Sequence, residues 1–287
     1  MKKYCYYNGK ILSIEKALIP VNDIGFLRGF GVFDYIKAYD GVPFLLKEHV
    51  ARLKRSAASL GLKLPLKEKE IIAITMKLLA KHKAPRAGIR IIITGGTSSG
   101  GLLYEQRTPT FLVLIEDLVE LPTELFAQGA RLMSFEHERL FPEIKTLNYI
   151  NAVKLQKERI KKKAIEILYT HKGIILEATT SNFFLIKDKK LLTTKNSVLK
   201  GITRQHVIDL AQKRGFTIEQ RDIMLTELGE ADEAFITSTN KEVLPIIAVD
   251  SIKIGTGKVG PKTKELHQAF SQSIQTYVRR NSAYRTK

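Results

Sequence analysis

The chain has 287 residues, 44% of them hydrophobic, enough for one large domain or two modest ones with a real core. Its net charge is +18, but the surplus is spread along the chain, so we expect anionic small molecules rather than nucleic acid as partners. A single cysteine, Cys5, excludes an internal disulfide and fits a reducing, cytoplasmic setting, and no apolar run is long enough to span a bilayer.

The first part of the chain alternates short strands with two amphipathic helices. Strands are predicted where β-branched and aromatic residues run together, and helices where apolar residues recur every three or four positions. A loop rich in glycine and serine, at residues 95–101, separates the last two of these strands. The predicted strands are 4–7, 32–39, 42–46, 89–94 and 110–116, and the predicted helices are 48–60 and 68–82.

The pattern changes after residue 116. Residues 117–129, which include Pro122, predict a linker between a domain of residues 1–116 and a domain of residues 130–287. Strands and helices then follow one another without regular alternation, which favours an α+β fold over a doubly wound sheet. The predicted helices are 148–163, 203–214 and 261–279, and the predicted strands are 131–135, 166–169, 174–176, 182–186, 191–193, 217–221, 233–237, 243–249 and 252–254.

Two chemically reactive residues stand at the ends of predicted apolar elements, where scaffolds present functional groups. Lys145 lies between Ile144 and Leu147, just before a helix, and partly apolar surroundings would make its amine a nucleophile toward carbonyls. Glu177 ends an apolar strand, and a buried carboxylate needs a cationic partner. Taken singly, Lys145 is also typical of an ordinary surface lysine, and Glu177 of an exposed glutamate in a turn.

Two further segments offer hydrogen-bond donors to an anion. Gly201 and Ile202 precede Thr203 at the start of a predicted helix, where unpaired N–H groups and the helix dipole attract negative charge. Residues 237–242 end a strand with three hydroxyl side chains, which include Ser238 and Thr239. Each segment is also typical of a capped helix or a polar turn that binds nothing.

In this order and spacing, the four segments resemble the class IV aminotransferases, the family of branched-chain and D-amino-acid aminotransferases and aminodeoxychorismate lyase. The resemblance covers nearly the whole chain, from DIGFLRGFGVF at residues 23–33 through EHVARL at 48–53 to GKVGPKT at 257–263. It implies an α+β, two-domain D-amino-acid-aminotransferase-like fold, with a small α/β N-terminal domain and a larger C-terminal domain whose core resembles a β-barrel. It also implies a homodimer, or a multiple of dimers, with the active site at the dimer interface.

Matched residue by residue, the resemblance assigns a site for pyridoxal 5'-phosphate. Lys145 matches the lysine that holds the cofactor as a Schiff base and shuttles the substrate proton. Glu177 matches the glutamate that keeps the pyridine nitrogen protonated, so that the ring can absorb electrons. The other predicted cofactor contacts are Arg52, Gly201, Ile202, Thr203, Ser238 and Thr239 at the phosphate and Tyr149 at the phenolic oxygen.

The substrate is predicted from departures within the resemblance. D-amino-acid aminotransferases carry an Arg-x-His pair where this chain has Gly95-Gly96-Thr97, so the carboxylate fork for D-substrates is missing. Branched-chain enzymes carry Tyr-x-Arg where this chain has Gly88-Ile89-Arg90, which keeps only the arginine. Phe33 replaces a tyrosine common in D-specific relatives. The predicted substrate contacts are Phe33, Arg90, Thr97 and Asn240, and no metal site is predicted.

We therefore expect an L-amino acid such as leucine, isoleucine or valine as donor and a 2-oxo acid, 2-oxoglutarate, as acceptor. Arg90 would bind the distal carboxylate of the acceptor or form a structural ion pair. A D-amino-acid aminotransferase and an aminodeoxychorismate lyase would use the same cofactor contacts and remain alternatives. The non-enzymatic alternative is a basic nucleic-acid-binding protein.

Overall fold

The computed structural model describes residues 3–281, which fall into two compact units. Unit 1 comprises the chain up to Val119, the short segment Ile144–Asn148 and the chain from Ile274 onward. Unit 2 comprises Glu120–Glu143 and Tyr149–Ser273. Each unit has its own sheet and its own hydrophobic core.

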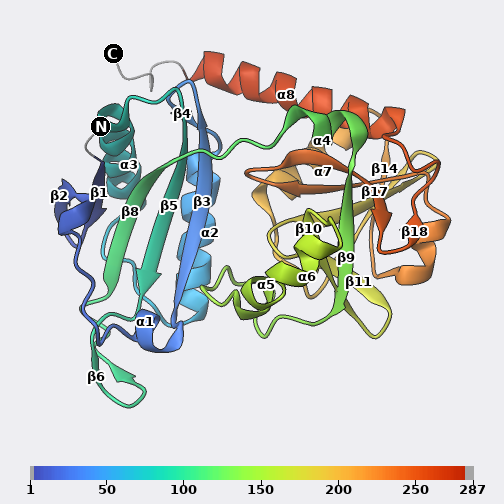
Figure 1. Cartoon of the computed structure of the whole chain (residues 1–287). Helices are drawn as coiled ribbons and strands as arrows, with labels where there is room; N and C mark the ends of the chain where they lie inside the picture. Colours follow the sequence, from blue (N-terminus) through green and yellow to red (C-terminus); the bar gives the residue numbers. More distant parts are fainter. Residues whose placement is uncertain (1–2, 282–287) are drawn as a thin grey trace. The chain divides into compact units, whose positions relative to one another are not determined.

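Unit 1 is built on a six-stranded antiparallel sheet with the order β2-β1-β8-β5-β3-β4 (Figure 1). The pairing of β3 with β5 sets Tyr35 opposite Arg90 and Lys37 opposite Gly88. The strands are β1 (Tyr4–Tyr7), β2 (Lys10–Ser13), β3 (Gly31–Tyr39), β4 (Val42–Pro43), β5 (Arg86–Thr94) and β8 (Thr110–Asp117).

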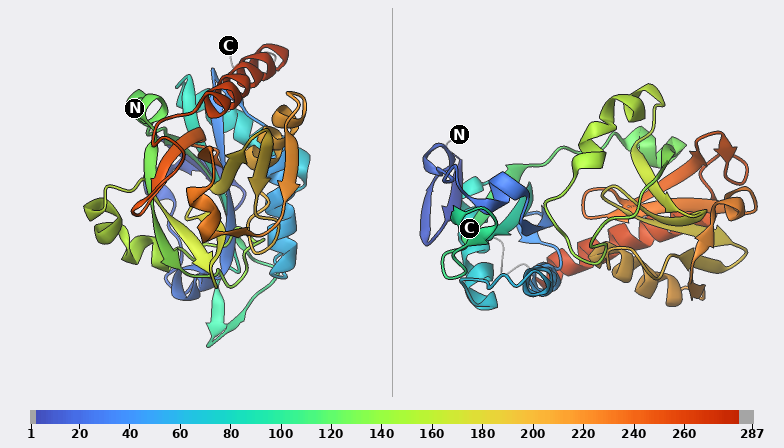
Figure 2. Two further views of the ribbon diagram at one scale, coloured as in Figure 1. Left: turned by 90° about the vertical axis from the view of Figure 1, so that its right-hand side faces the viewer. Right: turned by 90° about the horizontal axis from the view of Figure 1, so that it is seen from below.

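Two helices, α2 (Leu46–Ser59) and α3 (Glu68–His82), pack against one face of this sheet. Their apolar residues share one cluster with Ile89 and Ile91 of β5, and Figure 2 shows the long helix α2 running along the strands. Alternate residues of a strand point to opposite faces. The face turned away from the helices therefore carries Phe33, Tyr35 and Arg90.

Smaller elements gather at one end of the unit 1 sheet, where α1 (Ile24–Arg28) lies near the hairpin of β6 (Ser98–Gly100) and β7 (Leu103–Tyr104) (Figure 1). Buried Asp23 fixes this end, because its carboxylate caps α1 at Gly25 N and accepts the hydroxyls of Thr94 and Thr110 at 2.9 and 2.5 Å. A 3-10 turn, η1 (Ile14–Lys16), follows β2.

Unit 2 contains a closed ring of six strands in the order β12-β16-β17-β9-β10-β11, which the pairing of β11 with β12 completes. This ring confirms the barrel-like core that the resemblance implies. Large apolar side chains such as Phe183 and Ile236 fill it. The ring strands are β9 (Ala130–Glu136), β10 (Glu166–His171), β11 (Ile174–Ala178), β12 (Asn182–Lys187), β16 (Glu233–Ser238) and β17 (Glu242–Val249), and the added strands are β13 (Lys190–Thr193), β14 (Thr217–Gln220), β15 (Ile223–Met224) and β18 (Ile252–Lys253).

The helices of unit 2 surround this ring. The prediction of a single continuous helix at residues 148–163 is wrong, because the chain turns at Leu155 and forms two short helices. Among residues 3–281, none of the helices is both long and apolar enough to cross a membrane. The helices are α4 (Thr123–Gln128), α5 (Ile150–Lys154), α6 (Gln156–Lys161), α7 (Ile202–Gln212), η2 (Leu225–Gly229) and α8 (Pro261–Arg280), whose last residues from Ile274 belong to unit 1.

Candidate active site

Lys145 belongs to unit 1, although it lies far along the chain from the other residues of that unit. Its segment is fastened to the start of β3, since Phe33 N donates to Lys145 O at 3.0 Å and Leu147 N donates to Gly31 O at 3.1 Å. Position 31 requires glycine, because an added Cβ would lie 2.7 Å from a backbone oxygen of β5. The Lys145 Nζ atom lies 4.7 Å from the centroid of the Phe33 ring, so its amine faces an aromatic wall.

Arg52, the predicted phosphate ligand, is fixed on α2 by a carboxylate from β3. Its Nε and Nη2 atoms donate to the two oxygens of Asp34 at 2.9 and 2.8 Å, and His49 Nδ1 lies 2.6 Å from the same carboxylate. All three side chains are buried. Burial alone would raise the pKa of Asp34, but Arg52 and His49 hold that pKa well below its usual range. The arginine is thus locked in one orientation.

The pKa of His49 is lowered, mainly because the ring is buried, although the Asp34 carboxylate acts in the opposite direction. The positive charges of Arg52 and Lys145 lower it further. His49 is therefore neutral at pH 7 and donates a hydrogen bond to Asp34. Neither Asp34 nor His49 was among the predicted site residues, although His49 lies within the EHVARL motif that includes Arg52.

Arg90 lies on the same face of the sheet as Phe33 and forms an ion pair. Its Nε and Nη2 atoms donate to the two carboxylate oxygens of Glu116 on β8, at 2.7 and 3.1 Å. Its guanidinium carbon lies 5.5 Å from the centroid of the Phe33 ring and 5.0 Å from that of Tyr35. Of the two predicted roles of Arg90, the structural ion pair is the one seen in this structure. Arg90 and Lys145 both contact the ring of Phe33.

Tyr35 fills the space beside Gly88, the position where branched-chain enzymes carry a tyrosine. A Cβ added at Gly88 would lie 2.1 Å from the Tyr35 hydroxyl oxygen, so the two positions cannot both carry a full side chain in this arrangement. A phenol is thus supplied from the neighbouring strand β3 instead of β5. Burial and the charge of Glu116 raise the pKa of Tyr35, which is neutral at pH 7.

Thr97, a predicted substrate contact, lies at the opposite end of unit 1 from the β3–β4 turn, next to the β6–β7 hairpin. Its side chain is exposed, and its backbone forms an isolated bridge with Asp23. The hairpin that follows carries two exposed leucines, Leu102 and Leu103.

In unit 2, Glu177 is a buried carboxylate with three donors. Asn182 Nδ2 donates to it at 3.0 Å and Leu199 N at 3.1 Å, and Arg139 forms a close ion pair with its other oxygen. Arg139 also donates to the carbonyl oxygen of Pro142, which fixes the loop after β9. Such donors stabilise a carboxylate in its charged form. Arg139 was missed in the sequence because it is distant from Glu177 along the chain.

The start of α7 forms a cradle for an anion next to this carboxylate. Its N-cap, Gly201, is extended and offers no side chain to the first N–H groups of the helix, which include those of Ile202 and Thr203. A Cβ at Gly201 would lie 2.1 Å from Asn182 Oδ1, so a larger residue here would displace the Asn182 amide. Asn182 therefore contacts both Glu177 and the helix start, and ties the two predicted cofactor contacts together.

The turn between β16 and β17 carries Ser238, Thr239 and Asn240, and it is tied to the turn that follows Glu177. Lys241 Nζ lies 2.5 Å from a carboxylate oxygen of Glu166 and 3.1 Å from the hydroxyl of Thr180. Ser238 Oγ accepts a hydrogen bond from the Lys241 backbone N–H at 3.2 Å. Within the part of the chain that the structure describes, the buried hydroxyl of neighbouring Thr237 has no hydrogen-bond partner.

Each unit, taken by itself, presents groups of the kind that pyridoxal phosphate needs. Unit 1 contributes an amine on an aromatic wall and a fixed guanidinium, while unit 2 contributes a charged carboxylate and a helix start without a side-chain cap. An aldehyde needs the amine, a pyridine nitrogen needs the carboxylate, and a phosphate needs the N–H groups and hydroxyls. Tyr149, the last predicted cofactor contact, is half-buried at the N-cap of α5.

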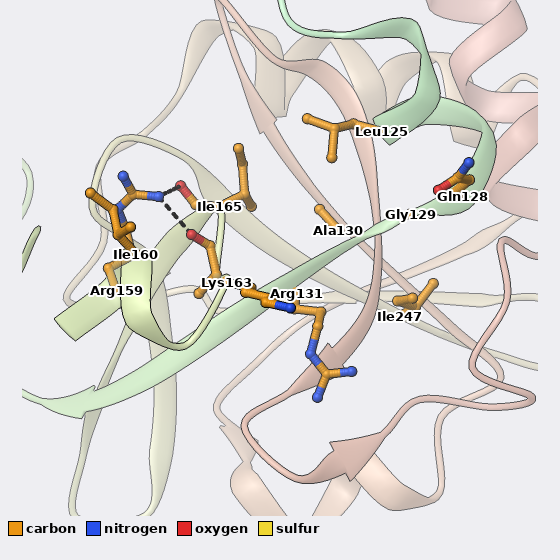
Figure 3. Close-up of a pocket in the computed structure, with 11 residues that line it drawn as sticks. Leu125, Gln128, Gly129, Ala130, Arg131, Arg159, Ile160, Lys163, Ile165 and Ile247 are labelled. Carbon is orange, nitrogen blue, oxygen red and sulfur yellow. Dashed lines mark hydrogen bonds between the residues drawn. The ribbon is translucent and has the colours of Figure 1, made fainter. Parts of the chain in front are cut away.

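A separate hollow of about 610 Å³ opens in unit 2 beside β9 and α6 (Figure 3). Most of its lining residues are apolar, and its two arginines are already engaged. Arg159 donates to the carbonyl oxygens of Ala164 and Ile165, and Arg131 donates to that of Asp250. The predicted site residues do not line this hollow, so it is not where the chemistry is expected.

Comparison with known proteins agrees with the resemblance. The family model described as amino-transferase class IV matches residues 31–249. A protein of Methanocaldococcus jannaschii provisionally named branched-chain-amino-acid aminotransferase is 36% identical over 92% of this chain and 94% of its own length. A D-alanine aminotransferase of Listeria monocytogenes is 32% identical over 93% of this chain and 94% of its own.

Solved structures match over nearly the full length. The branched-chain amino acid aminotransferase of Escherichia coli superposes with a TM-score of 0.89 at 28% identity, and covers 95% of this chain and 94% of its own. The branched-chain amino acid aminotransferase of T.th., complexed with N-(5'-phosphopyridoxyl)-L-glutamate, has a TM-score of 0.87 at 25% identity, over 96% of this chain and 94% of its own. Both likenesses confirm the predicted two-domain fold.

Proposed function

The chain belongs to the class IV aminotransferases, and on that premise we propose that it moves an amino group between an L-amino acid of the branched-chain type and 2-oxoglutarate. The family assignment confirms that the chain is a pyridoxal-phosphate-dependent transaminase. The observation that carries the substrate proposal is the wall beside Lys145, where the Phe33 ring offers an apolar surface and Arg90 offers a cation.

We propose distinct roles for the residues of unit 1 and unit 2 toward the cofactor. Bound pyridoxal phosphate supplies an aldehyde and an electron-withdrawing ring. Lys145 would bind at the aldehyde carbon and, once released by the substrate amine, move the proton at the substrate Cα as general base and acid. Glu177 would hold the ring nitrogen in its protonated form, because Asn182 and Arg139 keep its carboxylate charged and in place.

The phosphate would lie between charged and neutral donors. Arg52 would bind it with a guanidinium that Asp34 has already oriented, which reduces the entropy lost on binding. The N–H groups at Gly201–Thr203 and the hydroxyls of Ser238 and Thr239 would complete the cradle. Tyr149 would donate to the phenolic oxygen of the ring. These assignments rest on the family pattern together with the local geometry of each unit.

A D-amino-acid aminotransferase is the second candidate, and the Listeria relative favours it. Against it, the Arg-x-His pair of D-specific enzymes is absent at residues 95–97, and the two solved structures named above are branched-chain enzymes. A lyase acting on aminodeoxychorismate would need the same cofactor contacts. Substrate assays distinguish all three possibilities.

We also propose a homodimer or a multiple of dimers. Unit 1 exposes several large apolar side chains near α1 and on the β6–β7 hairpin, and exposed apolar side chains on neighbouring segments are typical of an interface. These residues are Leu18, Ile19, Val21, Phe26, Leu102 and Leu103. Light scattering at micromolar concentration should give at least twice the chain mass, and Phe26→Lys with Leu102→Lys should lower it. A monomeric wild type would contradict the proposal. A cytoplasmic location stays a prediction from the single cysteine.

The central test uses wild type and Lys145→Ala, with Lys154→Ala as a control lysine on α5. Wild type and the control should purify yellow, with near-violet absorbance that borohydride abolishes, while Lys145→Ala should lack this behaviour. A panel of L- and D-amino acids, scored by single-turnover conversion of the bound aldehyde to the amine, then identifies the donor. Preference for D-alanine, or release of pyruvate from aminodeoxychorismate, would replace the branched-chain assignment.

A further inference from the structure

The Arg90–Glu116 ion pair lies on the face of the sheet that carries the proposed substrate wall. Arg90 is on β5, Glu116 is on the neighbouring strand β8, and both side chains are about one third exposed, at 34% and 33%. The Phe33 ring links this pair to the reacting amine, since Lys145 Nζ and the Arg90 guanidinium both lie against it. The guanidinium carbon of Arg90 also lies 5.0 Å from the centroid of the Tyr35 ring.

In a transaminase of the proposed type, this wall must accept two chemically different substrates. The donor brings an apolar side chain, whereas the acceptor brings a distal carboxylate, and both must approach the same lysine. A cation without a counter-charge would be desolvated by the apolar side chain at considerable cost. A wall without any cation would fail to bind the carboxylate. A paired cation can serve both substrates if its partner can be exchanged.

We propose that Glu116 is a specificity-determining residue, which neutralises Arg90 while an apolar side chain occupies the wall and yields Arg90 to the distal carboxylate of a dicarboxylic 2-oxo acid. This inference rests on the proposed function, because it assumes that both kinds of substrate meet at Lys145. Glu116 then sets the balance between them. The partial exposure of the pair makes the exchange feasible, since neither charge is locked inside the core as Asp34 and Arg52 are.

The exchange requires no change in the fold. The guanidinium of Arg90 already lies near the rings of Phe33 and Tyr35, and a substrate carboxylate would replace the Glu116 oxygens as acceptor. Glu116, once displaced, lies near the end of β8, where water can solvate it. The competition therefore weakens the binding of dicarboxylates and strengthens the binding of apolar side chains, relative to a chain without the glutamate.

The test measures the binding of two unreactive substrate analogues to the cofactor-loaded protein by calorimetry. Glutarate represents the dicarboxylic acceptor, and 4-methylpentanoate represents the apolar substrate. Glu116→Gln should bind glutarate roughly fivefold more tightly and 4-methylpentanoate roughly fivefold more weakly than wild type, the range expected for a partly exposed ion pair. The KM values for 2-oxoglutarate and 4-methyl-2-oxopentanoate should move in the same opposite directions.

Asp117→Asn is the matched control. It removes the same charge from the next residue of β8, but its carboxylate is exposed and pairs with Lys3 at 2.6 Å. Its selectivity should equal that of wild type. A change as large as that of Glu116→Gln would show a general effect of net charge and overturn the proposal, as would unchanged selectivity in Glu116→Gln.

The double variant Arg90→Met with Glu116→Gln guards against misfolding, because it leaves no charge unpaired. In the Arg90→Met background, Glu116→Gln should no longer alter the binding of glutarate, and a persistent fivefold effect would overturn the proposal. The test also separates this inference from the proposed function. If wild type transaminates no branched-chain donor, the proposed function fails, while the calorimetric shifts still decide the role of Glu116.

Discussion

Asp34 on β3 accepts two hydrogen bonds from Arg52 on α2, one at each carboxylate oxygen, in a contact where neither residue is more than 6% exposed. The pair joins the sheet of unit 1 to a helix that packs on it, at the point where the phosphate ligand is predicted. A paired arginine is already oriented before any anion arrives. Stability and cofactor affinity should therefore depend on the same carboxylate.

Asp34→Asn should lower both quantities. The substitution leaves the Arg52 guanidinium buried without its counter-charge, which typically costs about 3–5 kcal/mol of unfolding free energy. The dissociation constant for pyridoxal phosphate, followed by absorbance, should rise by about tenfold or more, because Arg52 is no longer held in one orientation. Urea unfolding of Asp117→Asn, whose carboxylate is exposed, should differ from wild type by less than about 1 kcal/mol. Unchanged cofactor affinity in Asp34→Asn would contradict the orienting role.

His49 should make the stability of the protein depend on pH between neutral and mildly acidic conditions. The folded protein lowers the pKa of His49, chiefly by burial, while the unfolded chain binds a proton near pH 6.5. The stabilisation is therefore complete above pH 6.5 and is lost as the pH falls below it, by at most about 1.4 kcal/mol per pH unit. His49→Gln should show a flatter curve of unfolding free energy against pH from 7.5 to 5.5.

The control for this pH dependence is His171→Gln, whose ring is partly exposed at the end of β10. Its curve should keep the slope of wild type. Parallel curves for wild type and His49→Gln would mean that His49 takes up its proton equally well in the folded protein, contrary to the direction of its pKa shift.

The elements that the sequence predicted well are those whose pattern is local. Helix α3 spans Glu68–His82, as the apolar spacing of that segment predicts. The local pattern places Lys145 and Glu177 at the ends of apolar elements, but their cofactor roles come from the family resemblance and stay predictions. The predicted helix at 148–163 contains no glycine or proline, so the break at Leu155 has no local signal. Likewise the predicted linker at 117–129 contains α4, whose six residues are too few to show a helical repeat of apolar positions.

The parts of the site that could not be predicted depend on contacts between distant segments. Arg139 and Glu177 meet because of the ring of strands, and Asp34 meets Arg52 because α2 packs on β3. Tyr35 occupies the space where a tyrosine at position 88 would lie, and this depends on the register of β3 against β5. A single sequence contains the residue types of these contacts but not the register or the packing that brings them together.

Glu177→Gln should preserve binding of the cofactor and impair the reaction. Glutamine keeps the size of the side chain and can still accept from Asn182, but it carries no charge to hold a pyridine nitrogen in its protonated form. Loss of such a fixed electrostatic partner should lower kcat by roughly 100-fold. The near-violet absorbance of the bound cofactor should persist. The control is Glu143→Gln, because Glu143 is exposed and lies 3.7 Å from Lys200, and this variant should retain full activity. A Glu177→Gln enzyme with the kcat of wild type would contradict the proposed role of Glu177.

Gly88→Ala tests whether Tyr35 occupies the place of a side chain on β5. The new methyl group would lie 2.1 Å from the Tyr35 hydroxyl and 2.8 Å from the adjoining ring carbon, so the phenol must move off its position beside Arg90. We expect a loss of about 1–3 kcal/mol of unfolding free energy, the usual cost of overpacking. Gly229→Ala, where the added Cβ meets nothing within 4 Å, should be close to neutral.

The decisive measurement is the coupling between positions 88 and 35. In a Tyr35→Ala background the methyl group of Gly88→Ala has room, and alanine is less flexible than glycine in the unfolded chain, so the substitution should cost nothing or stabilise slightly. The interaction energy from the four proteins should then be about the full cost seen with tyrosine present. If Gly88→Ala is equally destabilising in both backgrounds, strain in the backbone of β5 rather than the tyrosine explains the glycine, and the phenol beside Arg90 loses its place in the substrate wall.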